Sequence, residues 1–383
     1  MKGYNQDVLK NQRVQLLAGE WLAKKLITED DLNAITQKYT PLPYQPSWFV
    51  KIGLFFFTWV CISGGTLIFI PFTSLENSEK YISPLYGFIL LFCLQYLIKD
   101  RKLHFSGIDN ALLYTIPLCF LFQIIDLASL LGDAPWLIGL CYLPVLGLLI
   151  YFYGEPLLTL IAYLDFLYIT AAISFEYPSG KVLLPFILFF LSILSWVLVR
   201  YLRKRDVSGY WSSALTLLHY ASLSTAYLSI NYGIVREGNM TLNGLQSPSP
   251  EIQFASMFWV LTFLITGLYL FFGYWLRKIS FLSLGGVFLA VSLFTVHHYY
   301  PIISGEWAFT LAGSLGLGVS VFLIHSLKTP KNGFSYEPSE DSGIGLIAGT
   351  VISTQLGGLA SETPEGPRFG EGDFGGGGAG QNY

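Results

Sequence analysis

The feature that most constrains this chain is a series of about ten apolar runs, because a helix needs about 20 consecutive apolar residues to cross a bilayer. Only 12% of the 383 residues are charged, whereas an average soluble domain has about 25%. The sequence therefore predicts an all-α fold, a polytopic transmembrane helical bundle. The predicted spans are 50–72, 82–98, 108–131, 134–153, 156–175, 181–200, 209–231, 253–276, 280–299 and 307–327.

Lysine and arginine are unevenly distributed between the segments that join these spans. If the N-terminus is inside, 19 of the 22 Lys and Arg residues fall in segments on the cytoplasmic side. Only Lys80, Lys181 and Arg236 lie elsewhere. Cytoplasmic loops of membrane proteins carry an excess of these residues. The pattern thus predicts a multi-pass protein with both termini in the cytoplasm.

Residues 6–39 predict a small helical hairpin in front of the first span. In "LITEDDL", Thr28 is the expected N-cap and Asp31 the third helical residue, a form of capping box. We interpret residues 1–46 as this cytoplasmic hairpin with a Pro-rich linker and residues 47–327 as the transmembrane domain. The hairpin is either a docking module for a partner or an amphipathic cap on the inner membrane surface.

Residues 328–383 are predicted to form a cytoplasmic tail whose Gly-rich end is flexible. Within the tail, 343–360 is weakly apolar and is interrupted by Gly, Thr, Ser and Gln. We interpret it as a packed or interfacial segment; as an eleventh span it would move the tail outside. Gly345-x-x-x-Gly349, and Ala312-x-x-x-Gly316 in the last span, have the small-residue spacing that allows close helix approach.

Two ionisable residues interrupt spans near their midpoints. Asp165 stands within "TLIAYLDFLYITAAISF", and His219 within "TLLHYASLS". Such residues are costly in a membrane and are functional candidates by default. If their spans are in contact, the pair would relay protons or bind a cation, because His changes charge near neutral pH. The alternative is that Asp165 is protonated and hydrogen-bonds between helices, with Tyr163 and Tyr168 as candidate partners.

A second polar set lies toward the predicted outer ends of the spans. These residues are candidates to line an outward-facing cavity, with Arg236 paired to Glu176 or Glu237 as a surface lock. Adjacent histidines point about 100° apart on a helix and do not easily clasp one metal ion, so no metal site is predicted. The outer set consists of Asp126, Glu176, Arg236, His297 and His298.

Enzyme signatures are missing from the sequence, which has no P-loop, GxSxG, HExxH or Rossmann fingerprint. The four cysteines lie inside apolar runs without CxxC spacing and are interpreted as small core side chains. The net charge of −3 argues against a nucleic-acid partner. We therefore predict no catalytic residue and no cofactor. The expected partners are the lipid bilayer and a cytoplasmic protein bound through 1–46 or 328–383.

Several stretches together resemble a known group of proteins. They are "LITEDDL", "FSGIDNALLY", "NYGIVREG", "TPKNGFSYEP" and "FGEGDFGGGGAG". They are similar to bacterial multi-pass membrane proteins whose N-terminal portion is classed only as a domain of unknown function. The resemblance implies a protein of the bacterial inner (plasma) membrane and carries over no catalytic residue. It draws attention to Asp109, Asn110, Asn231 and Arg236, which we interpret as residues that cap helix ends.

Two functional hypotheses follow. In the first, the protein is a non-enzymatic membrane component whose cytoplasmic ends bind partners. In the second, it is a transporter or channel for a small solute or ion, with Asp165 and His219 at a midplane site. Transporters commonly show internal repeats and broken helices, and this chain has no evident repeat and few breaking residues, chiefly Pro117 and Pro144. A membrane transferase is less favoured, because no acidic or Arg residues cluster at one membrane face.

Overall fold

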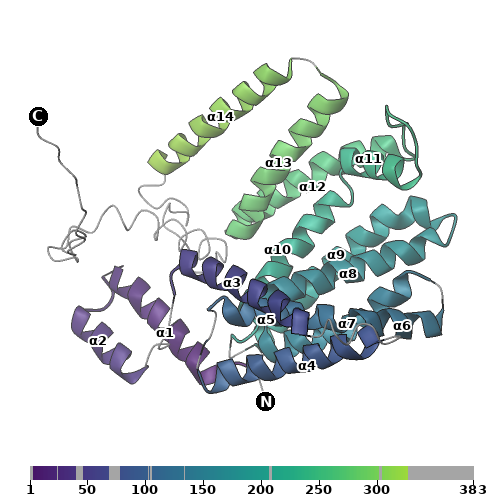
Figure 1. The fold of residues 1–383 in the computed structure, drawn as a ribbon. Coiled ribbons are helices and arrows are strands. Elements are labelled where there is room, and N and C mark those ends of the chain that lie inside the picture. Colours follow the sequence, from purple (N-terminus) through teal and green to yellow (C-terminus); the bar gives the residue numbers. More distant parts are fainter. Residues whose placement is uncertain are drawn as a thin grey trace, which may run out of the picture. The chain divides into compact units, whose positions relative to one another are not determined.

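The computed structural model describes residues 3–326, except 24, 40–45, 69–77, 102, 104–105, 133, 207–208 and 302–303. The chain divides into two compact units, Met1–Tyr336 and Glu337–Tyr383, and every described residue belongs to the first. Throughout this part of the chain the regular elements are helices and there is no strand (Figure 1). The predicted all-α class is therefore confirmed for the described residues, whereas the predicted tail segment 343–360 and the Gly-rich end lie outside them.

Two short helices precede the apolar ones and pack against each other, α1 (Gln6–Ala23) and α2 (Glu29–Lys38). The predicted cap of α2 is confirmed. The Thr28 hydroxyl oxygen accepts a hydrogen bond from the backbone N–H of Asp31, and the Asp31 carboxylate accepts one from the backbone N–H of Thr28. This reciprocal pair satisfies donors that a helix N-terminus otherwise leaves free. It therefore fixes where the second helix begins.

Eight predicted spans correspond to stretches that are long and apolar enough to cross a membrane. The junction between the predicted spans 134–153 and 156–175 consists of two non-helical residues, Gly154 and Glu155. Gly154 takes the left-handed conformation at φ 64°, and Pro156 starts the next helix. The helices that form these spans are α3 (Trp48–Thr66), α4 (Ser78–Lys99), α5 (Ile108–Cys119) with α6 (Leu121–Leu131), α7 (Trp136–Tyr153), α8 (Pro156–Phe175), α9 (Gly180–Arg205), α12 (Ala255–Trp275) and α13 (Ile279–Tyr299).

Two further predicted spans are helical but are not among these eight. The predicted span 209–231 forms α10 (Ser212–Leu228), which has 17 residues and is followed by the short helix α11 (Tyr232–Leu242). The predicted span 307–327 forms α14 (Gly305–Ser326), which has 22 residues. The total of about ten spans therefore stays a prediction.

The predicted span 108–131 is one apolar run but two helices. Pro117 has no backbone N–H and so removes one helical hydrogen bond. The chain passes through a turn at Phe120, whose backbone N–H donates to the carbonyl of Pro117 at 3.3 Å. Proline in the middle of α7, at Pro144, does not break that helix.

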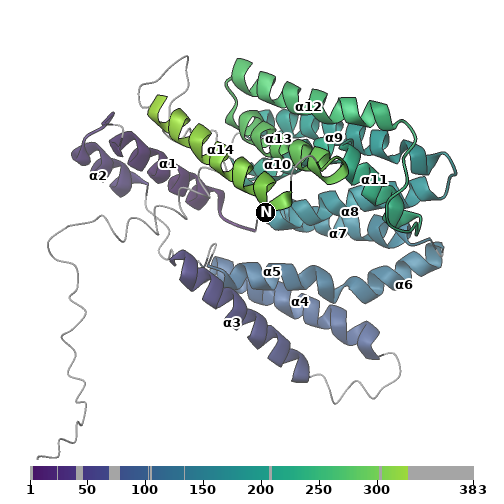
Figure 2. The same ribbon diagram turned by 90° about the horizontal axis from the view of Figure 1, so that it is seen from above.

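The apolar helices pack as consecutive antiparallel pairs that are joined laterally. The pairs α7–α8, α9–α10 and α12–α13 are in contact, and α10 also contacts α8, α12 and α13. Figure 2 shows α12 lying beside α13, and α4 beside α5. One buried core joins Tyr4 to residues of α3, α4, α5, α7 and α8, a second lies among α10, α12 and α13, and a third joins α11 to α12. α10 thus links the pair α7–α8 to the pair α12–α13.

The cysteines depart from their predicted role. Cys119 is buried, but Cys61 and Cys93 are exposed on α3 and α4. The prediction of core positions is therefore wrong for these two residues. In a membrane domain, apolar side chains face lipid as well as the interior, so an apolar neighbourhood in the sequence does not imply burial.

Candidate functional site

Asp165 lies on α8 with its carboxylate against α7. A Cβ atom built on Gly139 would lie 2.6 Å from Asp165 Oδ1, so only glycine leaves room for the carboxylate at this contact. Within the described part of the chain, Asp165 Oδ2 is buried without a hydrogen-bond partner. A buried polar atom without a partner costs about 1–3 kcal/mol. Asp165 is thus not an ordinary satisfied interior residue, which keeps it a candidate for function.

His219 is buried on α10, with 8% of its surface exposed. Its Nε2 lies 3.3 Å from the Ser280 hydroxyl of α13, and its ring packs edge-on against Phe281. The other ring nitrogen, Nδ1, is buried and has no partner among the described residues. His219 therefore faces α13.

A pair of Asp165 and His219 requires that their helices touch and that their side chains meet, and only the first of these holds. Helices α8 and α10 are in contact. However, the two side chains turn to different neighbours, Asp165 to α7 and His219 to α13. No hydrogen bond or ion pair links them in the described residues. The structure thus provides two separate polar positions within the bundle.

Arg236 is the centre of the outer set, on α11. Its guanidinium donates hydrogen bonds to the Ser249 carbonyl and the Tyr232 hydroxyl, and it lies 3.6 Å from the Glu251 carboxylate. It also stands over the ring of Tyr299 at 4.6 Å, a cation–π contact. These contacts hold α11 and the loop after it against the end of α13.

Glu237, beside Arg236, binds the same end of α13. Its Oε1 accepts hydrogen bonds from the hydroxyls of Tyr299 at 2.6 Å and Ser249 at 2.7 Å. These bonds stabilise the ionised form and lower the pKa of Glu237 below its ordinary value. His298 contacts the ring of Tyr299 edge-on, with centroids 4.8 Å apart. The predicted pairing of Arg236 with Glu176 or Glu237 is therefore wrong for the described residues, because the ionic partner of Arg236 is Glu251.

The other outer residues belong to different surroundings. Glu176 accepts a hydrogen bond from the indole N–H of Trp136 at 2.6 Å. Asp126 lies on α6, where its backbone carbonyl accepts from the Ser129 hydroxyl. His297 is half-buried on α13. The outer set is therefore several local contacts, and its five predicted members do not form one cluster.

A buried polar cluster that the sequence did not predict lies where the N-terminal segment meets α5. The Tyr4 hydroxyl donates to Asp109 Oδ2 at 2.8 Å, and the backbone N–H of Ser106 donates to Asp109 Oδ1 at 2.9 Å. Asp109 is fully buried. It is thus satisfied from both sides, and it also stands in the first turn of α5, as expected from its position in the sequence.

Glu155 extends this cluster. It is 4% exposed, and its Oε1 accepts a hydrogen bond from the Tyr114 hydroxyl at 2.5 Å. The Tyr210 hydroxyl donates to the Phe152 carbonyl and also accepts from the backbone N–H of Tyr4 at 3.3 Å. We call this set the Tyr4 cluster; it consists of Tyr4, Asp109, Tyr114, Glu155 and Tyr210.

Burial determines the titration of the cluster outside the spans. Burial raises the pKa of Glu155, and the nearby charge of Asp109 adds to that effect, while the hydrogen bond from Tyr114 opposes it. Burial and Asp109 likewise raise the pKa of Tyr4 well above its ordinary value. Tyr4 is therefore a neutral donor at physiological pH.

A chain of buried hydroxyl groups connects α10, α12 and α13. The Tyr227 hydroxyl lies 2.8 Å from Ser292 Oγ, which lies 3.0 Å from Thr266 Oγ1. The Asn231 side-chain amide donates to the Tyr227 hydroxyl at 2.8 Å, and its oxygen caps α11. Asn231 is therefore a helix cap, as interpreted from the sequence, and also part of the interior. Such bonds between helices stabilise packing within a membrane.

No match to this chain was found among protein-family models, curated proteins or solved structures. The class of protein therefore follows from the fold. Eight helical stretches in the described residues are long and apolar enough to span a membrane. The chain is a multi-pass helical membrane protein.

Proposed function

We propose that this protein is a non-enzymatic component of the bacterial inner membrane and that its cytoplasmic hairpin, α1–α2, binds a protein partner. The observation that carries the proposal is the anchoring of the residues just before α1. The backbone N–H of Gly3 donates to the Phe152 carbonyl at 2.7 Å, and Tyr4 is held by Asp109. The hairpin is thus joined to the bundle at its start as well as through the linker to α3.

The hairpin also displays apolar side chains on a polar surface. Leu26, in the turn between α1 and α2, is 69% exposed, and Trp21 is 37% exposed. α2 has no buried residue. Exposed apolar side chains that are surrounded by polar ones often mark a surface that binds another protein. The alternative, an amphipathic cap on the membrane surface, would bury the same residues in lipid headgroups.

A photo-crosslinking amino acid at position 26 tests the proposal in intact membranes. A partner predicts one discrete protein adduct at position 26 and none at Gln37, an exposed position at the end of α2 that serves as the control. Adding the variant Tyr4→Ala, which removes the anchor, should weaken the adduct. Adducts with lipid alone would show that the hairpin lies on the membrane, and the proposal would be abandoned.

A second candidate function is a transporter or channel for a small solute or ion, with Asp165 and His219 as polar groups of the pathway. The supporting observation is that Asp165 Oδ2 and His219 Nδ1 are buried without partners among the described residues. Unsatisfied groups of this kind are tolerated where function requires them.

Thermal stability of Asp165→Asn in detergent, from about pH 5 to 8, tests this second candidate. An ionisable, functionally placed carboxylate predicts that Asn raises the melting temperature and removes a pH dependence, because functional groups often reduce stability. A variant that is neutral or less stable, with an unchanged pH profile, would identify Asp165 as a protonated contact between helices. Tyr168→Phe, at an exposed tyrosine on the same helix, is the control.

A further inference from the structure

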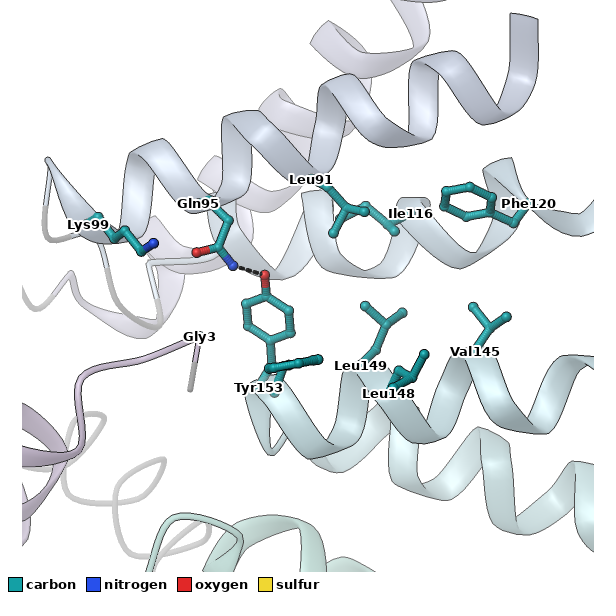
Figure 3. A pocket seen from close by; sticks show the side chains of 11 residues that line it. Gly3, Leu91, Gln95, Lys99, Ile116, Phe120, Val145, Leu148, Leu149 and Tyr153 are labelled. Carbon is teal, nitrogen blue, oxygen red and sulfur yellow. Dashed lines mark hydrogen bonds between the residues drawn. The ribbon is translucent and has the colours of Figure 1, made fainter. Parts of the chain in front are cut away.

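A groove of about 410 Å³ runs between α4, α5 and α7 (Figure 3). The groove is open to the surface on one side, where Leu148 is 60% exposed. Leu149, beside it, is buried. Neither Asp165 nor His219 lines it. Its apolar lining includes Leu91, Ile116, Phe120, Val145, Leu148 and Leu149.

One end of the groove is polar. Gln95 donates a hydrogen bond from its amide to the Tyr153 hydroxyl, and Lys99 lies one turn further along α4 (Figure 3). Lys99 is exposed and forms no ion pair with the described part of the chain. The positive charge of Lys99 thus lies at one end of the apolar groove, beside the hydrogen-bonding groups of Gln95 and Tyr153.

The length of the groove corresponds to one leaflet. Its far end is near the edge-on contact of Phe120 with Phe88, whose ring centroids are 5.3 Å apart. From Phe88 to Lys99 on α4 the rise is about 16 Å at 1.5 Å per residue. The hydrocarbon core of a bilayer is about 30 Å thick. A groove of this length covers about half of it, and Lys99 is the last residue of the apolar stretch Tyr81–Lys99 that is long enough to cross a membrane.

We infer that this groove binds one anionic phospholipid, with an acyl chain along its apolar walls and the phosphate beside Lys99. Apolar walls of one-leaflet depth favour an acyl chain, and an ammonium that has no ion-pair partner among the described residues favours a negative headgroup. Gln95 and Tyr153 offer further hydrogen bonds to headgroup oxygens. A zwitterionic lipid would fill the same walls but would gain less from Lys99.

Native mass spectrometry of the full chain in detergent tests the inference, with phosphatidylglycerol and phosphatidylcholine of the same chains added in turn. We expect one phosphatidylglycerol to remain bound, with about five-fold preference over phosphatidylcholine, the effect of one lysine near an anionic headgroup. Lys99→Gln should abolish this preference. Lys204→Gln removes an exposed positive charge from the end of α9, outside the groove, and should preserve it.

A second variant separates the groove from the charge. Leu148→Trp adds bulk at an exposed position of the groove wall and should reduce the binding of both lipids without unfolding the protein. Equal binding of the two lipids by the native chain would overturn the inference, as would a preference that survives Lys99→Gln. A dimer without lipid would instead assign the groove to a second copy of the chain. Competition by inorganic phosphate alone would also overturn it.

Discussion

Two carboxyl groups, Asp109 and Glu155, are buried close to each other in the Tyr4 cluster, and each accepts a hydrogen bond from a tyrosine. Their surroundings differ. Asp109 accepts further bonds from Ser106, whereas Glu155 has mainly the hydroxyl of Tyr114 and the charge of Asp109 nearby. Burial without compensating donors favours the protonated form. The raised pKa of Glu155 therefore gives this end of the bundle a pH-dependent contribution to stability.

Glu155→Gln should reduce the pH dependence of stability. The pKa of Glu155 is raised in the folded protein, so the folded state holds the proton more tightly than the unfolded chain does. Its contribution to stability is complete below the ordinary pKa, about 4.3, and is lost as pH rises through the folded pKa. Gln resembles the protonated acid and can still accept from Tyr114. We expect the variant to exceed the native protein in melting temperature at pH 8 and to differ little at pH 5.

Glu306→Gln is the matched control for this prediction, because Glu306 is exposed in the first turn of α14. It should leave the pH profile of the melting temperature unchanged. A gain for Glu155→Gln that is larger at pH 5 than at pH 8 would contradict the assigned cause, since it would mean that the ionised form stabilises the fold.

At this scale the sequence identifies unusual residues but not their partners. Asp165, His219 and Arg236 are recognisable because each is polar in or beside an apolar run. Tyr4 and Asp109 are 105 residues apart, and no local pattern relates them. The same holds for Arg236, whose ionic partner, Glu251, lies in the loop after α11. Several acidic residues lie near Arg236 in the sequence, and the tertiary structure determines which of them becomes its ionic partner. A single sequence does not show which one this is.

Close packing of α12 on α13 depends on glycine. A Cβ atom on Gly273 would lie 2.6 Å from the backbone nitrogen of Leu282, and one on Gly285 would lie 2.8 Å from the side chain of Leu270. A side chain could rotate to relieve such a contact, but the backbone of Leu282 can move only if the helix itself shifts. Small residues at such positions let helices approach closely in a membrane. The geometry of this pair is therefore controlled by two positions.

Gly273→Ala should destabilise the α12–α13 pair, because overpacking of this kind typically costs about 1–3 kcal/mol. Gly267→Ala is the control within the same helix, because nothing lies within 4 Å of its Cβ position. Alanine favours a helix over glycine by up to about 1 kcal/mol, so the control should be neutral or stabilising. Melting temperatures in detergent measure both. Equal losses in the two variants would show that the effect is intrinsic to α12.

Helix positions are largely predictable from the sequence, and helix contacts are not. The lengths of the apolar runs, together with Gly154 and Pro156 between them, predict where α7 ends and α8 begins. In contrast, the small-residue spacing noted in α14, Ala312-x-x-x-Gly316, corresponds to no close contact among the described residues, since none of them lies within 4 Å of a Cβ on Gly316, and Gly345-x-x-x-Gly349 lies outside these residues. The turn at Phe120 was also missed, since the apolar run continues through it while Pro117 interrupts only the hydrogen bonds.

For the whole molecule, topology depends on whether α10 crosses the membrane. Its 17 residues give a length of about 26 Å, near the lower limit for a bilayer core of about 30 Å. α10 nevertheless contacts α8, α9, α12 and α13, as a central span would. If it crosses, the basic end of α9 and the loop after α11 lie on opposite sides. This arrangement agrees with the charge distribution that predicts both termini inside.

Single-cysteine labelling would decide this point in a background in which the four native cysteines are replaced. Lys204→Cys and Gln246→Cys both lie at exposed positions, one at the end of α9 and one in the loop after α11. A crossing α10 predicts that a membrane-impermeant maleimide labels position 246 in intact spheroplasts, and position 204 only after the membrane is opened. Labelling of both positions from the same side would mean that α10 does not cross. Every helix after it would then have the opposite orientation, and the lysine and arginine residues after α12 would face outside, against the charge bias from which the topology was inferred.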